Sequence, residues 1–185
     1  DSRSLGNANA FICLYGDRFD AFDLIESLLD TNIRVVFYEG RSGRKSIISK
    51  LVSSNSELPI FIEVESIFDF LLELGSIASD EFRRAGGTII GLTGSNGKTT
   101  NKEMLAWLLS GLLPGKVLWT KGNLNNHIGV PLTLLRLNSS YKIAIIEMGT
   151  NHPGEIEVLA KTANPTIGMI TNIGHAHLEF LIDLE

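Results

Sequence analysis

A chain of 185 residues that is 44% hydrophobic and 20% charged has ordinary globular composition and suits one large domain or two small ones. Its formal net charge of −5 argues against a nucleic-acid binder, which usually presents a basic face. No apolar stretch approaches the roughly 20 residues of a membrane span, so we expect no membrane insertion. The single cysteine, Cys13, is expected to be a small buried side chain and suits a reducing cytoplasm.

The first segment of the chain alternates between expected strands and helices. Apolar and β-branched runs predict the strands, and one-sided apolar spacing predicts the helices. The strands are expected over 10–15, 34–38 and 59–64, and the helices over 22–30 and 66–84. Ser66 is expected to cap the second helix, with Asp69 three residues on. Residues 41–44 are expected to form a turn or an exposed loop.

The pattern restarts after Gly86-Gly87, which is the expected domain boundary. Strands are then expected over 88–93, 116–120, 141–148 and 166–171, and helices over 98–113, 131–137 and 154–162. Strands that alternate with helices predict a mostly parallel sheet. The expected fold class is therefore α/β, with a small domain over residues 1–85 and a second domain over residues 86–185.

The strongest functional signal is a glycine-rich run between an expected strand and an expected helix, Gly94-Ser95-Asn96-Gly97-Lys98-Thr99-Thr100. Small residues let backbone N–H groups converge on phosphate oxygens, and the start of a helix adds partial positive charge. Lys98 would reach the outer phosphates, and the Thr99 hydroxyl would coordinate magnesium. The strict pattern G-x-x-x-x-G-K-[ST] is not met, because Leu92 stands in place of its first glycine. This shorter phosphate-binding loop (P-loop) predicts binding of ATP with magnesium, and the competing interpretation is a plain strand-to-helix turn.

Two further candidate sites lie at the ends of strands in the same expected sheet: one holds an acid, and the other holds two histidines. Glu147 ends an apolar strand, at the sheet edge where ligands bind in open α/β folds and where Mg²⁺ takes one or two carboxylates. The alternative for Glu147 is a solvated acid. His175 and His177 follow the strand over 166–171, and a zinc site is disfavoured because no cysteine or further histidine is near. Each histidine is therefore either functional or merely structural.

Three asparagines lie close together in the run 121–131. Asn123, Asn125 and Asn126 offer many amide donors and acceptors. The sharper interpretation is a substrate-binding loop, and the alternative is a turn.

Across these runs the sequence resembles the Mur ligases, which form amide bonds in bacterial cell-wall synthesis. The motifs that carry the resemblance are the P-loop, Lys102-Glu103-Met104, the run 122–131, Glu147-Met148-Gly149, Gly154-Glu155-Ile156 and the run 170–179. The N-terminal part resembles the family's sugar-nucleotide domain more loosely, through Asp1-Ser2-Arg3, Phe11-Ile12, Gly16, Asp20 and the run 23–25. Within the family, the resemblance is strongest to the member that adds D-alanyl-D-alanine to UDP-N-acetylmuramoyl-tripeptide.

The resemblance implies roles for the residues of these motifs. The P-loop from Gly94 to Thr100 would bind ATP, with Lys98 on its phosphates, and Thr99 with Glu147 would hold a first magnesium ion. His177 would help to place a second magnesium ion near an acyl phosphate. The residues implied to contact the substrate are Asn123, Asn125 and Asn126 at the muramoyl-peptide and Ser2 and Arg3 at the uridine-diphosphate end.

The resemblance also implies an architecture and a cellular setting. Residues 1–85 would bind the UDP-sugar-peptide, and residues 86–185 would form part of a P-loop central domain. Family members continue past residue 185, so we expect a fragment that does not ligate alone, cut from a cytoplasmic, monomeric enzyme of peptidoglycan synthesis that serves cell shape and division. The alternatives are a sister Mur ligase, a ligase that adds glutamate to folate, and a non-catalytic nucleotide-binding remnant.

Overall fold

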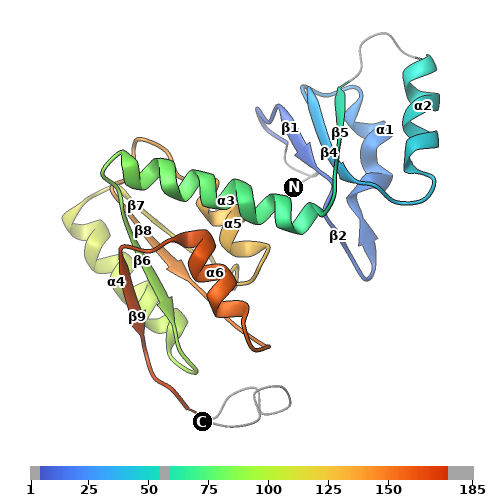
Figure 1. Cartoon of the computed structure of the whole chain (residues 1–185). Coiled ribbons are helices and arrows are strands. Elements are labelled where there is room, and N and C mark those ends of the chain that lie inside the picture. Colours follow the sequence, from blue (N-terminus) through green and yellow to red (C-terminus); the bar gives the residue numbers. More distant parts are fainter. Residues whose placement is uncertain (1–4, 55–58, 175–185) are drawn as a thin grey trace. The chain divides into compact units, whose positions relative to one another are not determined.

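The computed structural model describes residues 5–54 and 59–174 and confirms the expected α/β class (Figure 1). Contacts divide the chain into two compact units, Asp1–Phe70 and Leu71–Glu185. The division falls inside helix α3 (Ile67–Arg84). Among the described residues, no helix is long and apolar enough to cross a membrane.

The first unit is built on a small parallel sheet. Its strands are β1 (Ala10–Ile12), β4 (Val35–Glu39) and β5 (Ile60–Val64), in the order β1-β4-β5. Between β1 and β4 lie the antiparallel pair β2 (Tyr15–Gly16) and β3 (Phe19–Asp20), the 3₁₀ turn η1 (Ala21–Leu24) and the short helix α1 (Ile25–Leu28). Cys13 is fully buried in the core of this unit, as expected, and burial raises the pKa of its thiol to about 12.

Helix α2 (Arg44–Ser54) is a feature that the sequence patterns did not predict. Its run is polar overall, and its hydrophobic residues Ile48 and Leu51 pack against the core of the first unit. The expected turn or exposed loop over 41–44 is confirmed as a turn at Ser42-Gly43, but it is wrong at Arg44, which begins α2 and is only 4% exposed. The Arg44 guanidinium pairs with Asp20, donates to the Glu39 carbonyl oxygen at 2.9 Å and lies over the Phe22 ring. An arginine with so many partners is buried because its charge and its donors are satisfied.

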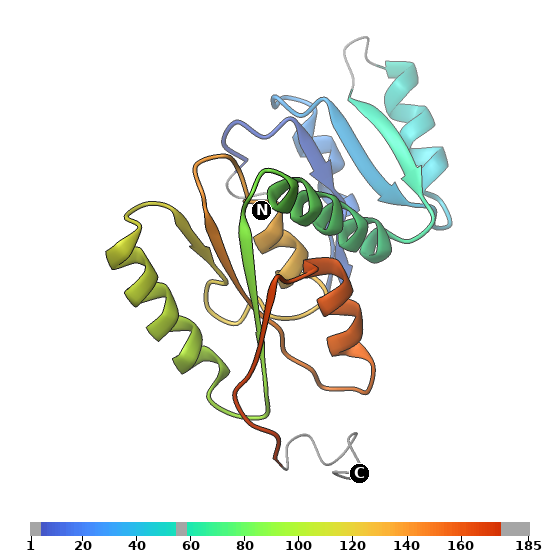
Figure 2. The same cartoon turned by 60° about the vertical axis from the view of Figure 1, so that its left-hand side comes forward.

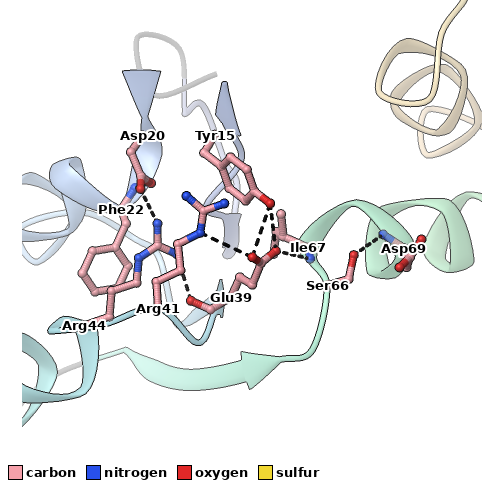
Figure 3. A network of polar contacts seen from close by, with 9 residues as sticks. All are labelled: Tyr15, Asp20, Phe22, Glu39, Arg41, Arg44, Ser66, Ile67 and Asp69. Carbon is pink, nitrogen blue, oxygen red and sulfur yellow. Dashed lines mark hydrogen bonds and ion pairs between the residues drawn. The ribbon is translucent and has the colours of Figure 1, made fainter. Parts of the chain in front are cut away.

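The Glu39 carboxylate, at the end of β4, is the centre of a polar network in this unit (Figure 3). It accepts hydrogen bonds from the Tyr15 hydroxyl at 3.2 Å, the Arg41 Nε at 3.3 Å and the Ile67 backbone N–H at 3.1 Å. Burial alone would raise the pKa of Glu39, but the hydrogen bonds from Ile67, Arg41 and Tyr15 outweigh it and lower the pKa. The network therefore fastens the end of a strand to the first residue of α3.

Helix α3 begins as expected, because the Ser66 hydroxyl accepts a hydrogen bond from the Asp69 backbone N–H at 3.2 Å (Figure 3). Beyond Phe70 the helix belongs to the second unit. A Cβ atom at Gly75 would lie 2.7 Å from the Cβ of Pro131, so the helix approaches its neighbour closely at a residue without a side chain.

The second unit is a four-stranded parallel sheet with helices on both faces (Figures 1 and 2). The strand order is β7-β8-β6-β9, and the strands are β6 (Thr88–Thr93), β7 (Val117–Trp119), β8 (Ile143–Glu147) and β9 (Ile167–Ile170). The helices are α4 (Lys98–Leu112), α5 (Gly129–Leu134) and α6 (Glu155–Ala163). Each of these elements confirms one that was expected from the sequence, with boundaries shifted by a few residues.

Alternating residues of β8 supply both cores of the second unit. Ile145 packs with Ala106 of α4 on one face, whereas Ala144 and Ile146 pack with α5, α6 and the end of α3 on the other. Because β8 is buried on both faces, its sequence is a continuous apolar run up to Glu147. The register pairs Leu92 of β6 with Glu147 of β8, so the carboxyl ends of these two neighbouring strands meet at the same sheet edge.

Candidate nucleotide and metal site

The P-loop follows β6 and depends on glycine at two places. Gly94 has φ 138°, and a Cβ atom there would lie 2.1 Å from the Thr171 hydroxyl oxygen. Gly97 caps α4 in the left-handed region, with φ 76°. Both conformations favour glycine, and the first is also a close approach to the segment after β9. The glycines thus bring the chain directly from a strand into the start of a helix.

The segment after β9 holds the P-loop from one side. The Ser95 hydroxyl donates to the Gly174 carbonyl oxygen at 2.9 Å and accepts from the Gly174 N–H at 3.0 Å. The backbone N–H groups of Ser95 and Asn96 donate to the carbonyl and side-chain oxygens of Asn172. The N–H groups of the first turn of α4 have no acceptor within the helix. Those of Lys98, Thr99 and neighbouring residues are therefore the donors that this loop offers to an anion.

Lys98 is folded onto its own loop. Its Nζ donates to the Gly94 carbonyl oxygen at 2.6 Å and to the Ser95 carbonyl oxygen at 3.3 Å. The side chain also lines a pocket of about 650 Å³. The ammonium group therefore lies where phosphate oxygens would meet the first turn of α4.

Glu147 joins three parts of the second unit. Its residue is 1% exposed, and its Oε1 accepts from the Thr99 hydroxyl at 3.2 Å and from the Asn125 Nδ2 at 2.8 Å. The Glu147 backbone N–H donates to the Thr120 hydroxyl at 3.0 Å. The structure thus brings together Thr99, Glu147 and one of the three asparagines, and Glu147 is not a solvated acid.

Lys102 is part of this cluster, although the sequence patterns gave it no role. Its side chain is fully buried, and its Nζ lies 3.3 Å from Glu147 Oε2 and 3.1 Å from Glu103 Oε1. The same Nζ donates to the Gly122 carbonyl oxygen at 3.1 Å. A signal was present in the sequence, because a residue three positions after Thr99 lies on the same side of a helix.

The oxygen ligands fit a magnesium ion. A hydroxyl and a carboxylate oxygen 3.2 Å apart are hard donors, and the buried Glu147 Oε2 atom has no hydrogen-bond partner among the described residues. Among residues 5–54 and 59–174, no three histidine, cysteine or acidic side chains gather as a metal site. Mg²⁺ does not need such a set, because it usually takes one or two carboxylates and completes its shell with phosphates and water.

The pocket beside Lys98 is lined by the loops that follow β7 and β8. Asn125 and Asn126 line it, whereas Asn123 is not among its lining residues. The Asn126 side-chain oxygen also accepts from the Gly129 N–H at 2.9 Å, so this residue shapes the turn into α5 as well. The turn and the substrate-loop interpretations of this run are therefore compatible for Asn126.

Glu155 organises the other wall of the pocket. Its carboxylate accepts from the backbone N–H groups of Asn151 at 2.6 Å and His152 at 3.0 Å, and from the Thr150 hydroxyl at 3.1 Å. The hydrogen bond from Asn151 is the largest effect, and together with those from His152 and Thr150 it lowers the pKa of Glu155 to about 2 against the opposing effect of burial. The sequence signal that could have identified Glu155 is its position as an acid in the first turn of an expected helix.

Three expected site residues, Ser2, Arg3 and His177, lie outside the described residues, as does His175.

A parallel α/β sheet whose first βα turn is a P-loop beside a buried carboxylate defines a P-loop nucleotide-binding protein. The family model of the Mur ligase middle domain matches residues 92–185, and the chain belongs to the Mur ligase family. This finding confirms the resemblance inferred from the motifs.

Curated relatives and solved structures agree with this family. UDP-N-acetylmuramoyl-tripeptide–D-alanyl-D-alanine ligases of Bacillus subtilis and Escherichia coli are each 36% identical, over 98% and 97% of this chain. The chain spans 36% of the length of each of them. A crystal structure of MurF from Acinetobacter baumannii is 36% identical with a TM-score of 0.80, covering 99% of this chain and 37% of that one. The MurF ligase of Thermotoga maritima in complex with ADP is 31% identical with a TM-score of 0.77, covering 99% and 39%.

Proposed function

We propose that this chain supplies the nucleotide site of an ATP-dependent ligase that adds D-alanyl-D-alanine to UDP-N-acetylmuramoyl-tripeptide in peptidoglycan synthesis. The observation that carries the proposal is the meeting of Thr99, Asn125 and Glu147 beside the P-loop. The names of the curated relatives supply the substrates, and the ADP complex of one structural relative supports a nucleotide ligand.

The proposed reaction makes an amide bond in two steps. A carboxylate oxygen of the tripeptide attacks the γ-phosphorus of ATP, the bond to the bridging oxygen breaks, and ADP leaves. The amine of D-alanyl-D-alanine then attacks the carbonyl carbon of the acyl phosphate, loses a proton and expels inorganic phosphate. Both steps bring anions together, so catalysis depends on positioning and on positive charge.

The residues of the second unit divide this work. Lys98 and the N–H groups at the start of α4 would hold the outer phosphates, and Thr99 with Glu147 would hold magnesium. When bound, magnesium supplies positive charge that screens the repulsion between the phosphates and the attacking carboxylate. Asn125 and Asn126 line the pocket next to Lys98, where the muramoyl-peptide would lie.

The remaining assignments rest on the family. His177 would serve a second magnesium ion, and Ser2 and Arg3 would contact the uridine diphosphate. Residues 1–85 would form the UDP-sugar-peptide domain and residues 86–185 part of the ATP-binding central domain. Asn123 would face the substrate through its loop rather than through the pocket wall. A cytoplasmic monomer without membrane insertion completes the proposal.

The test is ATP-dependent phosphate release by the full protein with different amines. We expect release only when UDP-N-acetylmuramoyl-tripeptide and D-alanyl-D-alanine are both present. Release with glutamate or another single amino acid in place of the dipeptide would show a sister ligase. Binding of ATP without release in any mixture would show a nucleotide-binding module and contradict the proposal.

A further inference from the structure

Lys102 is a lysine whose side chain is wholly enclosed by the protein. It lies on α4, on the stripe that continues with Ala106 into the core against β7 and β8. A buried ammonium group is costly unless it is paired and hydrogen-bonded. Its three donors face three oxygens, those of Glu147, Glu103 and the Gly122 carbonyl group. The role of this lysine is therefore to pair with the oxygens of these three residues.

The two carboxylates around Lys102 differ in how much they need it. The Glu103 side chain is 53% exposed, so water screens and solvates its charge. The Glu147 side chain is 1% exposed and depends on protein groups. Glu147 Oε2 lies 3.3 Å from the Lys102 Nζ and accepts no hydrogen bond from any described residue. Lys102 therefore places a positive charge beside Glu147 Oε2, and this oxygen can still accept a hydrogen bond.

Lys102 also connects Glu147 to the pocket-lining loop. The Gly122 carbonyl oxygen binds the Lys102 Nζ, and the Asn125 Nδ2 binds Glu147 Oε1. The Asn125 carbonyl oxygen in turn accepts from the Gly149 N–H at 2.8 Å. The loop over 122–125 is therefore attached on both sides of one carboxylate, to Lys102 at one end and to Glu147 itself at the other.

We propose that Lys102 is a positioning residue that acts as the counter-charge of Glu147 when no metal is bound. In doing so it holds the Oε1 atom towards Thr99 and keeps the 122–125 loop in place. The inference rests on the proposed function, in which Glu147 binds magnesium. Arrival of the metal brings a second source of positive charge to the same carboxylate, so Lys102 matters most to the metal-free protein and opposes binding of Mg²⁺ alone.

The test is the thermal unfolding midpoint of the full protein carrying Lys102→Met, measured with and without Mg²⁺. Methionine keeps the length of the side chain and removes its charge. We expect the midpoint to fall by roughly 5 °C or more without metal, because one partner of a buried pair is lost. We expect Mg²⁺ alone to raise the midpoint of the variant at least about twice as much as that of the wild type, because the metal replaces the missing charge. An equal loss with and without Mg²⁺ would show a purely structural lysine and overturn the inference.

Two further variants keep the result interpretable. Glu103→Gln is the matched control, since it removes the exposed partner of Lys102 and should leave both the midpoint and its Mg²⁺ response near those of the wild type. The double variant Lys102→Met/Glu147→Gln removes both charges and should recover most of the lost midpoint without any response to Mg²⁺. If the single variant does not fold, a folded double variant supports the inference, and an unfolded one shows that Lys102 acts through packing and overturns it.

The same measurements separate this inference from the proposed function. If the wild type shows no rise in its midpoint with Mg²⁺ and ATP, the nucleotide-site assignment fails, while recovery by the double variant still reports on the ion pair. If the wild type responds and Lys102→Met loses the same amount in every condition, the inference fails and the nucleotide site stands.

Discussion

Glu39 and Glu147 are each the last residue of a strand in a parallel sheet, yet they do different work. Both oxygens of Glu39 accept hydrogen bonds, from Tyr15, Arg41 and Ile67, and the carboxylate fastens a helix to its unit. Glu147 is more deeply buried, and its Oε2 accepts no hydrogen bond from the described residues. Position at a strand end therefore does not distinguish a structural acid from a functional one. A buried carboxylate oxygen that accepts no hydrogen bond is the feature that distinguishes the functional acid from the structural one.

The largest expected effect lies at the P-loop that faces Glu147. Lys98→Ala should reduce ATP-dependent phosphate release roughly 10²–10³-fold or more, because the ammonium group supplies charge to the phosphates. Within the part of the chain that the structure describes, the Lys98 ammonium group bonds only carbonyl oxygens of its own loop, so the thermal unfolding midpoint should change little. Normal ATP-dependent phosphate release by folded Lys98→Ala protein would contradict the P-loop assignment.

Glu147→Gln tests the functional half of the comparison. The amide keeps the size of the side chain and loses the charge, so we expect phosphate release to fall roughly 10²-fold and the Mg²⁺ concentration for half-maximal rate to rise. The same substitution at the other strand end, Glu39→Gln, is the matched control and should leave the Mg²⁺ titration unchanged. An unaltered Mg²⁺ titration in Glu147→Gln would show that Glu147, like Glu39, is a structural acid.

Glu39→Gln tests the structural half. Hydrogen bonds to a charged group are each worth about 1.5–3 kcal/mol, so the free energy of unfolding should fall by about that amount at neutral pH. The pKa of Glu39 is lowered in the folded protein, so its contribution is present above the pKa of an unfolded glutamate and is lost as the pH falls through the folded pKa. Denaturant titrations across acidic pH should show the difference between wild type and variant shrinking. A constant difference would assign the effect to packing.

The smallest expected effect is at Glu155. Its carboxylate accepts several hydrogen bonds, as that of Glu39 does, but it is more exposed. Its side chain is 39% exposed, so Glu155→Gln should cost less than about 1 kcal/mol at neutral pH. The pKa is lowered from 4.5 to about 2, so this stability is complete above pH 4.5 and is lost towards pH 2. Chemical-shift titration of the Glu155 carboxyl carbon would check the value. An ordinary midpoint would show that the hydrogen bonds from the 150–152 loop do not persist in solution.

The second unit was predictable because its signals are local. Its buried strands are continuous apolar runs, and the P-loop marks the start of α4 by its own residues. The register that places Glu147 beside Leu92 follows from parallel pairing of neighbouring strands. The sheet edge and its main polar residues could therefore be inferred without the structure.

The parts that were missed depend on contacts between residues far apart in the sequence. Helix α2 is amphipathic only weakly, and its first residue, Arg44, is buried by pairing with Asp20, which lies 24 residues earlier in the chain. The burial of Lys102 likewise depends on Gly122, which reaches it through a loop. Local patterns carry no information about such partners, so they predicted a turn or an exposed loop up to Arg44 and assigned no role to Lys102.

The attachment of Gly174 to Ser95 has a consequence for motion. Both the N–H and the carbonyl group of Gly174 are bonded to one hydroxyl of the P-loop, and Asn172 holds the next two amides of that loop. These bonds join segments that lie 76 to 79 residues apart in the sequence. We therefore expect a ligand that displaces the P-loop to displace residues 172–174 as well, because these hydrogen bonds join the two segments.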